Sequence, residues 1–193
     1  MIMAAAFALT VAAEGGQAAG QGAQGGRGRG GFSIPPLLME SDAFPDGGVV
    51  PQKYAGRTGV QPGFKFSNAP AGTVSYAIIF HDVDVAFGGN TSDVLHWLVW
   101  NIPASSTGLP EGVMQGELPD GTRQVSLRFN GYMGPGAGPG PYHHYTLELF
   151  ALDTKIDVPM GMPAQAADTR TAVFNAMEGH VLGKALIVGR FHR

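Results

Sequence analysis

The chain has 193 residues, of which 44% are hydrophobic, which is enough material for one domain with a substantial core. Its formal net charge of −3 argues against binding to duplex nucleic acid, which requires a basic surface. The sequence contains no cysteine, so it cannot form a disulfide, a catalytic thiolate or a cysteine-ligated zinc site. Its 30 glycines and 14 prolines, with only 14% charged residues, favour a loop-rich β domain over a helical bundle.

The first 31 residues differ in composition from the rest. Residues 1–16, "MIMAAAFALTVAAEGG", have the apolar run and small residues of a signal peptide. The run is too short to cross a membrane as a helix. Residues 17–31 are rich in glycine and read as a flexible linker. We therefore expect a periplasmic or secreted protein without an integral membrane segment in its mature form. A disordered tail on a cytoplasmic protein is the alternative.

A folded domain is expected over residues 32–193. A turn at Pro45–Gly48 comes first, since Pro-Asp-Gly-Gly is typical turn chemistry. Strands are then predicted where β-branched and aromatic residues dominate. They are Thr73–Val85, Val94–Ala104, Tyr145–Asp153 and Ala185–Phe191.

One main helix is predicted between Pro163 and Leu182. Ala172, Val173, Ala176 and Met177 have the spacing of one apolar helix face, and Gly183 suits a C-terminal stop. Strands that do not alternate regularly with helices indicate an antiparallel β fold with a peripheral helix.

Polar residues gather at the ends of three predicted strands. Alternation places Asp82 and Asp84 on the same side as Phe80. It places His96 with Leu98 and Trp100, and His143 with Tyr145, Leu147 and Leu149. If these strand ends meet, they form a cup of two acids, two imidazoles and a phenol.

The other histidines are expected to lie elsewhere. His81 falls on the side of its strand opposite to the aspartates, and His144 falls opposite to His143. His180 would lie near the negative end of the predicted helix. As alternatives, Asp82 and Asp84 could simply satisfy turn amides at the end of a strand, and His96 could be a half-buried structural histidine.

Motifs in this order resemble the phosphatidylethanolamine-binding protein family, also called Raf kinase inhibitor protein-like, in its bacterial branch. The first motif is "HDVDV" followed by "LHWLVWNIPA", and the second is "GYMGPGAGPGPYHHYTLELFALD". The family pattern of the first is Asp-Pro-Asp-Ala-Pro, and both prolines are absent here because Val83 and Ala86 occupy their places. The resemblance covers approximately residues 32–193.

The resemblance implies a mainly β fold, an antiparallel β-sandwich of a large and a small sheet with a C-terminal helix. It also implies a small anion-binding pocket for phosphate-like headgroups. Carried over residue by residue, the ligand-binding set is Asp82, Asp84, His96, Gly134, Pro135, His143 and Tyr145.

Three functions are compatible with these residues. The first is a module that binds a small phosphorylated or anionic ligand, with regulation of a partner protein as a further role. In such a module, the histidines and the phenol would donate hydrogen bonds to phosphoryl oxygens. The aspartates would orient the histidines or accept hydrogen bonds from an ammonium group. The second is a hydrolase or metal-dependent enzyme that uses the same Asp/His cluster. The third is an envelope protein with a vestigial pocket that binds a partner. We expect the first, with no catalytic residue, no metal and no cofactor.

Overall fold

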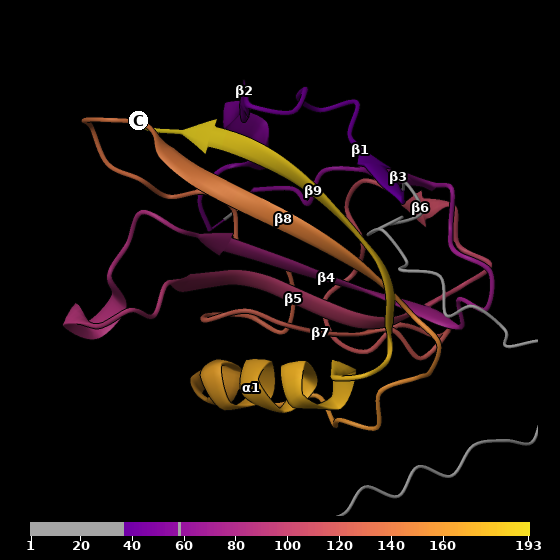
Figure 1. Ribbon diagram of the computed structural model, residues 1–193. Helices are drawn as coiled ribbons and strands as arrows, with labels where there is room; N and C mark the ends of the chain where they lie inside the picture. Colours follow the sequence, from indigo (N-terminus) through magenta and orange to yellow (C-terminus); the bar gives the residue numbers. More distant parts are fainter. Residues whose placement is uncertain (1–36, 58) are drawn as a thin grey trace, which may run out of the picture. The chain divides into compact units, whose positions relative to one another are not determined.

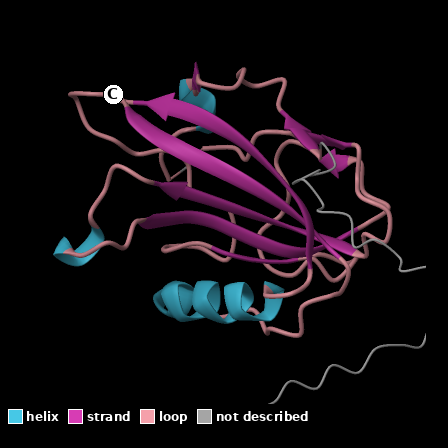
Figure 2. Ribbon diagram, viewed as in Figure 1, coloured by secondary structure: helices cyan, strands magenta, loops and turns pink. Residues whose placement is uncertain are grey.

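The computed structural model describes residues 37–57 and 59–193. These residues form two β-sheets that pack face to face, with one α-helix on the outer face of the larger sheet (Figures 1 and 2). The prediction of a mainly β sandwich with a C-terminal helix is confirmed. The predicted leader and linker lie outside the described residues and stay predictions.

The larger sheet has six strands in the order β2-β9-β8-β4-β5-β7. Their bounds are β2 Gly48–Val49, β4 Ser75–Asp82, β5 Val94–Pro103, β7 Arg123–Val125, β8 His143–Leu152 and β9 Val181–Phe191. The smaller sheet has the order β1-β3-β6, with β1 Leu38–Glu40, β3 Phe64–Ser67 and β6 Gly108–Leu109. All strand pairs are antiparallel except β2 with β9, which is parallel and which the sequence did not predict.

Three short 3-10 turns and one α-helix complete the described part. They are η1 Gln52–Tyr54, η2 Phe87–Gly89, η3 Pro163–Gln165 and α1 Ala166–Met177. Within residues 37–57 and 59–193, no helix is long and apolar enough to cross a membrane.

The predicted helix, Pro163 to Leu182, starts as the 3-10 turn η3 and continues as α1 from Ala166, but it ends earlier than predicted. Val173 and Met177 are buried, whereas Ala172 on the same predicted face is exposed. The chain leaves the helix at Gly179, whose φ of +79° is the left-handed conformation that commonly terminates helices. The predicted stop at Gly183 is therefore wrong: Gly183 lies inside β9, where it is buried.

Two apolar clusters cover the two faces of the larger sheet. The inner cluster joins both sheets and includes Phe66, Tyr76, Phe80 and Trp97. The outer cluster lies between the larger sheet and α1 and includes Ile79, Trp100, Phe150 and Val173. With both faces covered, the central strands β4 and β5 are buried almost throughout. Polar side chains on these strands are thus confined largely to their ends.

Candidate functional site

A cavity of about 470 Å³ lies where β4 ends and where β5 and β8 begin. This end of the sheet is on the left in Figure 1. We call it the strand-end cavity; its lining includes Asp82, His96, Gly134, His143 and Tyr145. Five of the seven residues predicted for the site therefore share one cavity. That they bind a ligand stays a prediction.

The pairing of β4 with β8 brings Asp82 and His143 together. Asp82 lies opposite Tyr145 in the ladder, and the Asp82 Oδ2 atom is 2.9 Å from Nδ1 of His143. Because a carboxylate only accepts hydrogen bonds, the His143 Nδ1 atom donates here. The Asp82 side chain is 4% exposed and that of His143 is 31% exposed. The buried acid thus fixes the orientation of an imidazole that is still open to the cavity.

His96 reaches the same cavity through a β-bulge. Phe80 pairs with Trp97, but the next residue of β4, His81, pairs with Leu95, so His96 is an extra residue on β5. His96 and Trp97 therefore both face the inner side of the sheet, whereas Leu98 faces the helix. The predicted alternation, which placed His96 with Leu98 and Trp100, is wrong for this reason.

The His96 ring is held in one protonation form by its neighbours. Its Nδ1 atom lies 2.9 Å from the Met133 carbonyl oxygen and 3.1 Å from that of Gly134. Carbonyl oxygens only accept, so Nδ1 carries the proton. Burial lowers the pKa of His96 below its ordinary value, although the two carbonyls and Asp82 oppose this. The neutral ring then presents Nε2 as an acceptor, and no partner for it lies within the described residues.

Tyr145 contributes a phenol that remains protonated. Its hydroxyl oxygen accepts hydrogen bonds from the Gly136 amide at 3.3 Å and the Ala137 amide at 3.1 Å. Burial, and then the negative charge of Asp82, raise the pKa of Tyr145 well above its ordinary value. The phenolic proton is therefore retained and can be donated to an acceptor in the cavity.

The loop around Gly134 and Pro135 forms a wall by pairing with another loop. The Gly134 amide donates to Gly56, and the Gly56 amide donates to the Pro135 carbonyl. A Cβ atom on Gly134 would lie 2.3 Å from the Tyr54 carbonyl oxygen, so only glycine allows this approach. Gly134 lines the cavity, whereas Pro135 lies behind it as part of the support.

Asp84 does not line the cavity. Its carboxylate accepts the His144 amide at 2.6 Å and lies 2.8 Å from His144 Nδ1, in an exposed pair. Hydrogen bonds from His144 lower the pKa of Asp84, although its partial burial acts against them. The chain turns after β4 ends at Asp82, so the strand alternation that grouped Asp84 with Asp82 no longer applies. His144 points away from the cavity, as expected.

His81 also points away from the cavity, as expected. Its two ring nitrogens face carboxylates of Asp93 and of Glu148 on the outer side of the sheet. His180 follows α1, and its Nδ1 atom lies 2.7 Å from the Asp153 carboxylate.

Three arginines at the strand-end cavity were not predicted from the sequence. Arg57, Arg128 and Arg193 line it from three separate segments, and all three are exposed. They lie outside the strands, where neither alternation nor motif spacing locates a side chain. The sequence around Arg128 contains no nearby acid, which weakly indicates an arginine without an ion-pair partner. No other sequence feature pointed to these arginines.

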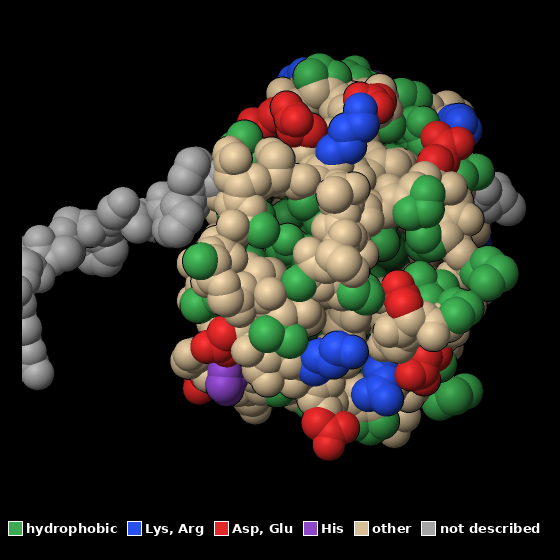
Figure 3. Space-filling view, turned by 90° about the vertical axis from the view of Figure 1, so that its right-hand side faces the viewer, with side chains coloured by type: hydrophobic (Ala, Val, Ile, Leu, Met, Phe, Trp, Pro, Cys, Tyr) green, Lys and Arg blue, Asp and Glu red, His purple; other side chains and the backbone are tan. Residues whose placement is uncertain are grey.

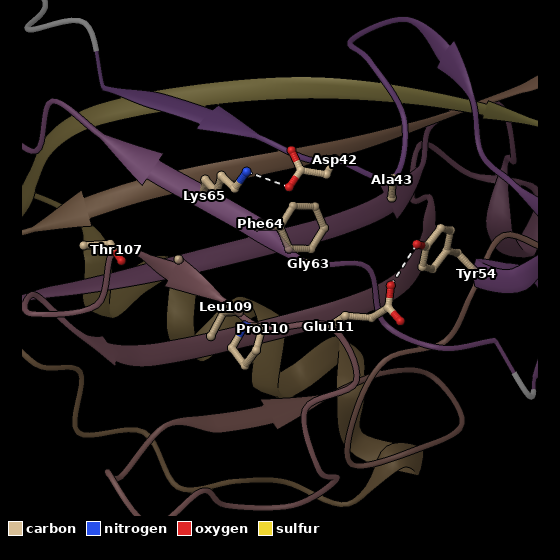
Figure 4. A pocket seen from close by; sticks show the side chains of 11 residues that line it. Asp42, Ala43, Tyr54, Gly63, Phe64, Lys65, Thr107, Leu109, Pro110 and Glu111 are labelled. Atoms are coloured by element: carbon tan, nitrogen blue, oxygen red, sulfur yellow. Dashed lines mark hydrogen bonds and ion pairs between the residues drawn. The ribbon is translucent and has the colours of Figure 1, made fainter.

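A second cavity, of about 500 Å³, lies beside the small sheet (Figure 4). Its charged side chains are already paired, Lys65 with Asp42, and Glu111 with Lys53 and the Tyr54 hydroxyl. Figure 3 shows the side of the molecule that carries β1, β3 and β6, with apolar side chains in a hollow and charged ones around it. Because its charges are satisfied internally, this cavity is a poorer candidate for an ionic ligand.

Within the described residues, no group of three or more histidine, aspartate or glutamate side chains is arranged to hold a metal ion. Asp82, His96 and His143 each bring hydrogen-bonding groups to the strand-end cavity. Together with the fold, they define a β-sandwich protein with a polar cavity at the strand ends of its larger sheet.

The chain belongs to the phosphatidylethanolamine-binding protein family, whose family model matches residues 40–192. The family resemblance read from the sequence motifs is thereby confirmed.

Relatives come from archaea and bacteria. A UPF0098 protein of Methanothermobacter thermautotrophicus is 36% identical over 161 residues, which cover 81% of this chain and 99% of that protein. The UPF0098 protein YbhB of Escherichia coli is 33% identical over 136 residues, which cover 65% of this chain and 84% of YbhB.

Solved structures show the same fold. The crystal structure of Escherichia coli YbcL, described as a new member of the mammalian PEBP family, has a TM-score of 0.68 and 25% identity. The match covers 81% of this chain and 98% of YbcL. A putative phosphatidylethanolamine-binding protein homologue of Chlamydia trachomatis has a TM-score of 0.67 and 25% identity, covering 82% of this chain and 99% of that one.

Proposed function

We propose that this protein is a binding module for a small phosphorylated ligand, which it holds in the strand-end cavity. The observation that carries the proposal is the meeting of His143, His96 and Tyr145 in one cavity, with Asp82 orienting His143. Membership of a family whose name records binding of a phospholipid supports a ligand-binding role. The proposal assigns no chemical step to these residues.

The donors at the cavity suit phosphoryl oxygens. Tyr145 keeps its proton and can donate it. His143 already donates from Nδ1 to Asp82, so its second ring nitrogen donates to a phosphoryl oxygen only when the ring carries both protons. Arg57 and Arg128 add charged donors at the mouth. Hydrogen bonds between charged groups and phosphate are shorter and stronger than neutral ones.

His96 places a condition on the ligand. In its neutral form the free nitrogen accepts a hydrogen bond and cannot donate one to a phosphoryl oxygen. A phosphate that keeps one proton can donate it to His96 Nε2. Alternatively, a fully ionised phosphate can bind if His96 takes up a proton. In both cases, binding is coupled to a proton at this position.

The test is a titration of ¹⁵N-labelled protein with inorganic phosphate and with phosphoethanolamine, followed by NMR. We expect saturable shifts of the Gly134, Gly136 and Ala137 amides, because these residues line the cavity. The amides of Lys65 and Leu109, at the small-sheet cavity, should not move. Saturable shifts confined to the small-sheet cavity, or none at all, would contradict the proposal.

A further inference from the structure

The mouth of the strand-end cavity carries positive charge that the protein does not neutralise. Neither Arg57 nor Arg128 forms an ion pair with an acid of residues 37–57 and 59–193. By contrast, Arg123 and Arg170, elsewhere on the surface, are paired with Glu117 and Asp93. Arg193 also lines this cavity, while Arg57 and Arg128 lie on exposed loops between elements of the fold.

The acidic side chain at this cavity is already engaged. Asp82 is the one acid among its lining residues, and its carboxylate is bound by His143. The nearby Asp84 is bound by His144 outside the cavity. The chain as a whole has a formal charge of −3, yet Arg57 and Arg128, which have no acidic partner within the described residues, line the same cavity. This local excess of positive charge attracts anions to the opening.

The cavity is also too large for one phosphoryl group. Its volume of about 470 Å³ falls in the range of small-molecule sites. A water molecule occupies roughly 30 Å³ in the liquid, so a single phosphoryl group fills only a minor part of this space. The remaining volume is bounded in part by the arginines that line the same cavity.

Building on the proposed function, we propose that the ligand carries a second anionic group, held by Arg57 and Arg128 while His143, His96 and Tyr145 hold its phosphoryl group. The chemical class is a small phosphorylated acid. The ammonium group of an ethanolamine headgroup is a poor fit, since it would face two arginines at the mouth while the acid at the floor is occupied by His143.

A matched pair of ligands tests this preference. Phosphoethanolamine and phosphoglycolate both carry a phosphate ester on a two-carbon chain, but one ends in an ammonium group and the other in a carboxylate. Isothermal titration calorimetry should show phosphoglycolate binding at least about tenfold more tightly, the typical gain from one added charge-assisted contact. Because the arginines are exposed, this ratio should fall as salt is added.

Substitutions test whether Arg57 and Arg128 cause the preference for phosphoglycolate over phosphoethanolamine. Arg57→Gln and Arg128→Gln should each reduce the ratio of the two affinities, and the double variant should bring it close to one. Lys155→Gln removes one positive charge from an exposed site beyond the opposite end of β8, and it should leave the ratio unchanged. If Lys155→Gln reduced the ratio of the two affinities as much as the arginine variants do, the preference for phosphoglycolate would come from net charge and not from Arg57 and Arg128.

Inorganic phosphate separates failure of this inference from failure of the proposed function. If phosphate binds, but phosphoglycolate binds no more tightly than phosphoethanolamine, the proposal of a second anionic group is wrong. The proposal of a phosphate-binding site is then still supported. If neither phosphate nor either ester binds, both proposals fail together.

Discussion

His143 and His144 are neighbours in sequence with opposite surroundings. His143 is oriented by the buried Asp82 and lines the cavity, whereas His144 pairs with the exposed Asp84 outside it. The two side chains are a matched pair, since they have the same chemistry and nearly the same position in the chain. They differ in access to the site.

His143→Ala should weaken binding of inorganic phosphate roughly ten- to a hundredfold, because loss of a hydrogen bond to a charged group costs about 1.5–3 kcal/mol. His144→Ala should change the affinity little. Calorimetric titration measures both, with thermal unfolding to verify the fold. His143→Gln, whose amide can still donate to Asp82, guards against simple misfolding. Equal effects of the two alanine substitutions would refute the assignment of the site.

His96 should make phosphate binding depend on pH. Its pKa is lowered in the free protein, so the ring is neutral there, but a bound phosphate dianion favours the protonated ring. Affinity for phosphoethanolamine should therefore rise as the pH falls from about 8 to about 6, the range in which histidine and phosphate esters titrate.

Calorimetry in two buffers of different ionisation enthalpy should detect proton uptake above the pKa of the phosphate ester. The uptake should decrease in His96→Asn, which keeps a donor to the Met133 carbonyl but cannot be protonated. Affinity that stays constant or falls towards acid pH would contradict this role of His96.

At the scale of the elements, alternation along a strand located some site residues and misplaced others. It held for β4 up to Asp82 and for β8, because these strands pair without a shift through the region of the site. It failed for β5, where His96 and Asn101 each lie at a shift in register. A bulge leaves little trace in a single sequence, since it depends on how two strands pair.

The site residues on loops could not be predicted from strand alternation, for a different reason. Gly134 could be assigned only through the family motif, and Arg57 and Arg128 belong to no motif that was recognised. Their positions depend on contacts between distant loops, such as the pairing of Gly56 with Gly134. Local sequence therefore predicted the four long strands and most of the cavity floor, but neither the short strands β1, β2, β3, β6 and β7 nor the arginines that line the cavity.

His81 joins several elements on the outer face of the sheet. Its two ring nitrogens donate to Asp93, before β5, and Glu148, on β8. Arg170 of α1 also binds Asp93, and Lys184 of β9 binds Glu148. Burial alone would lower the pKa of His81, but the two carboxylates raise it above its ordinary value. In return, the pKa of Glu148 falls to about 2, owing first to His81 and also to Lys184.

This network should make stability depend on pH in a defined direction. Since the pKa of His81 is raised in the folded protein, its contribution is complete below its ordinary pKa and is lost as the pH rises through the raised value. Urea unfolding should show His81→Gln less stable than wild type by roughly 1.5–3 kcal/mol near pH 5.5, and the difference should shrink near pH 8.5. A difference that grows with pH would exclude a charged His81.

At the scale of the whole molecule, the order of strands in the sheet differs from their order in the chain. The last strand, β9, lies between β8 and β2. The Gly47 amide donates to the Val188 carbonyl, and the Val188 amide donates to the Asp46 carboxylate, each at 2.8 Å. An early segment of the described domain, around β2, is thus joined to its last strand, β9, in one ladder.

A chain that stops at His180 should therefore not fold. It would lack β9, which pairs with β8 along its whole length, and the loss should exceed the 5–15 kcal/mol by which domains are typically stable. Circular dichroism and NMR dispersion measure the outcome. A chain that starts at Phe32 is the control and should fold, because the predicted domain begins there. A folded chain without β9 would contradict this prediction.

The position of β9 has a consequence for protein synthesis. Until β9 has been synthesised, β8 has an unpaired edge, and the apolar side chains that β9 covers are exposed. Open strand edges are sites of aggregation in incomplete chains. Nascent chains of this protein should depend on chaperones, or on slow release, until Phe191 has emerged.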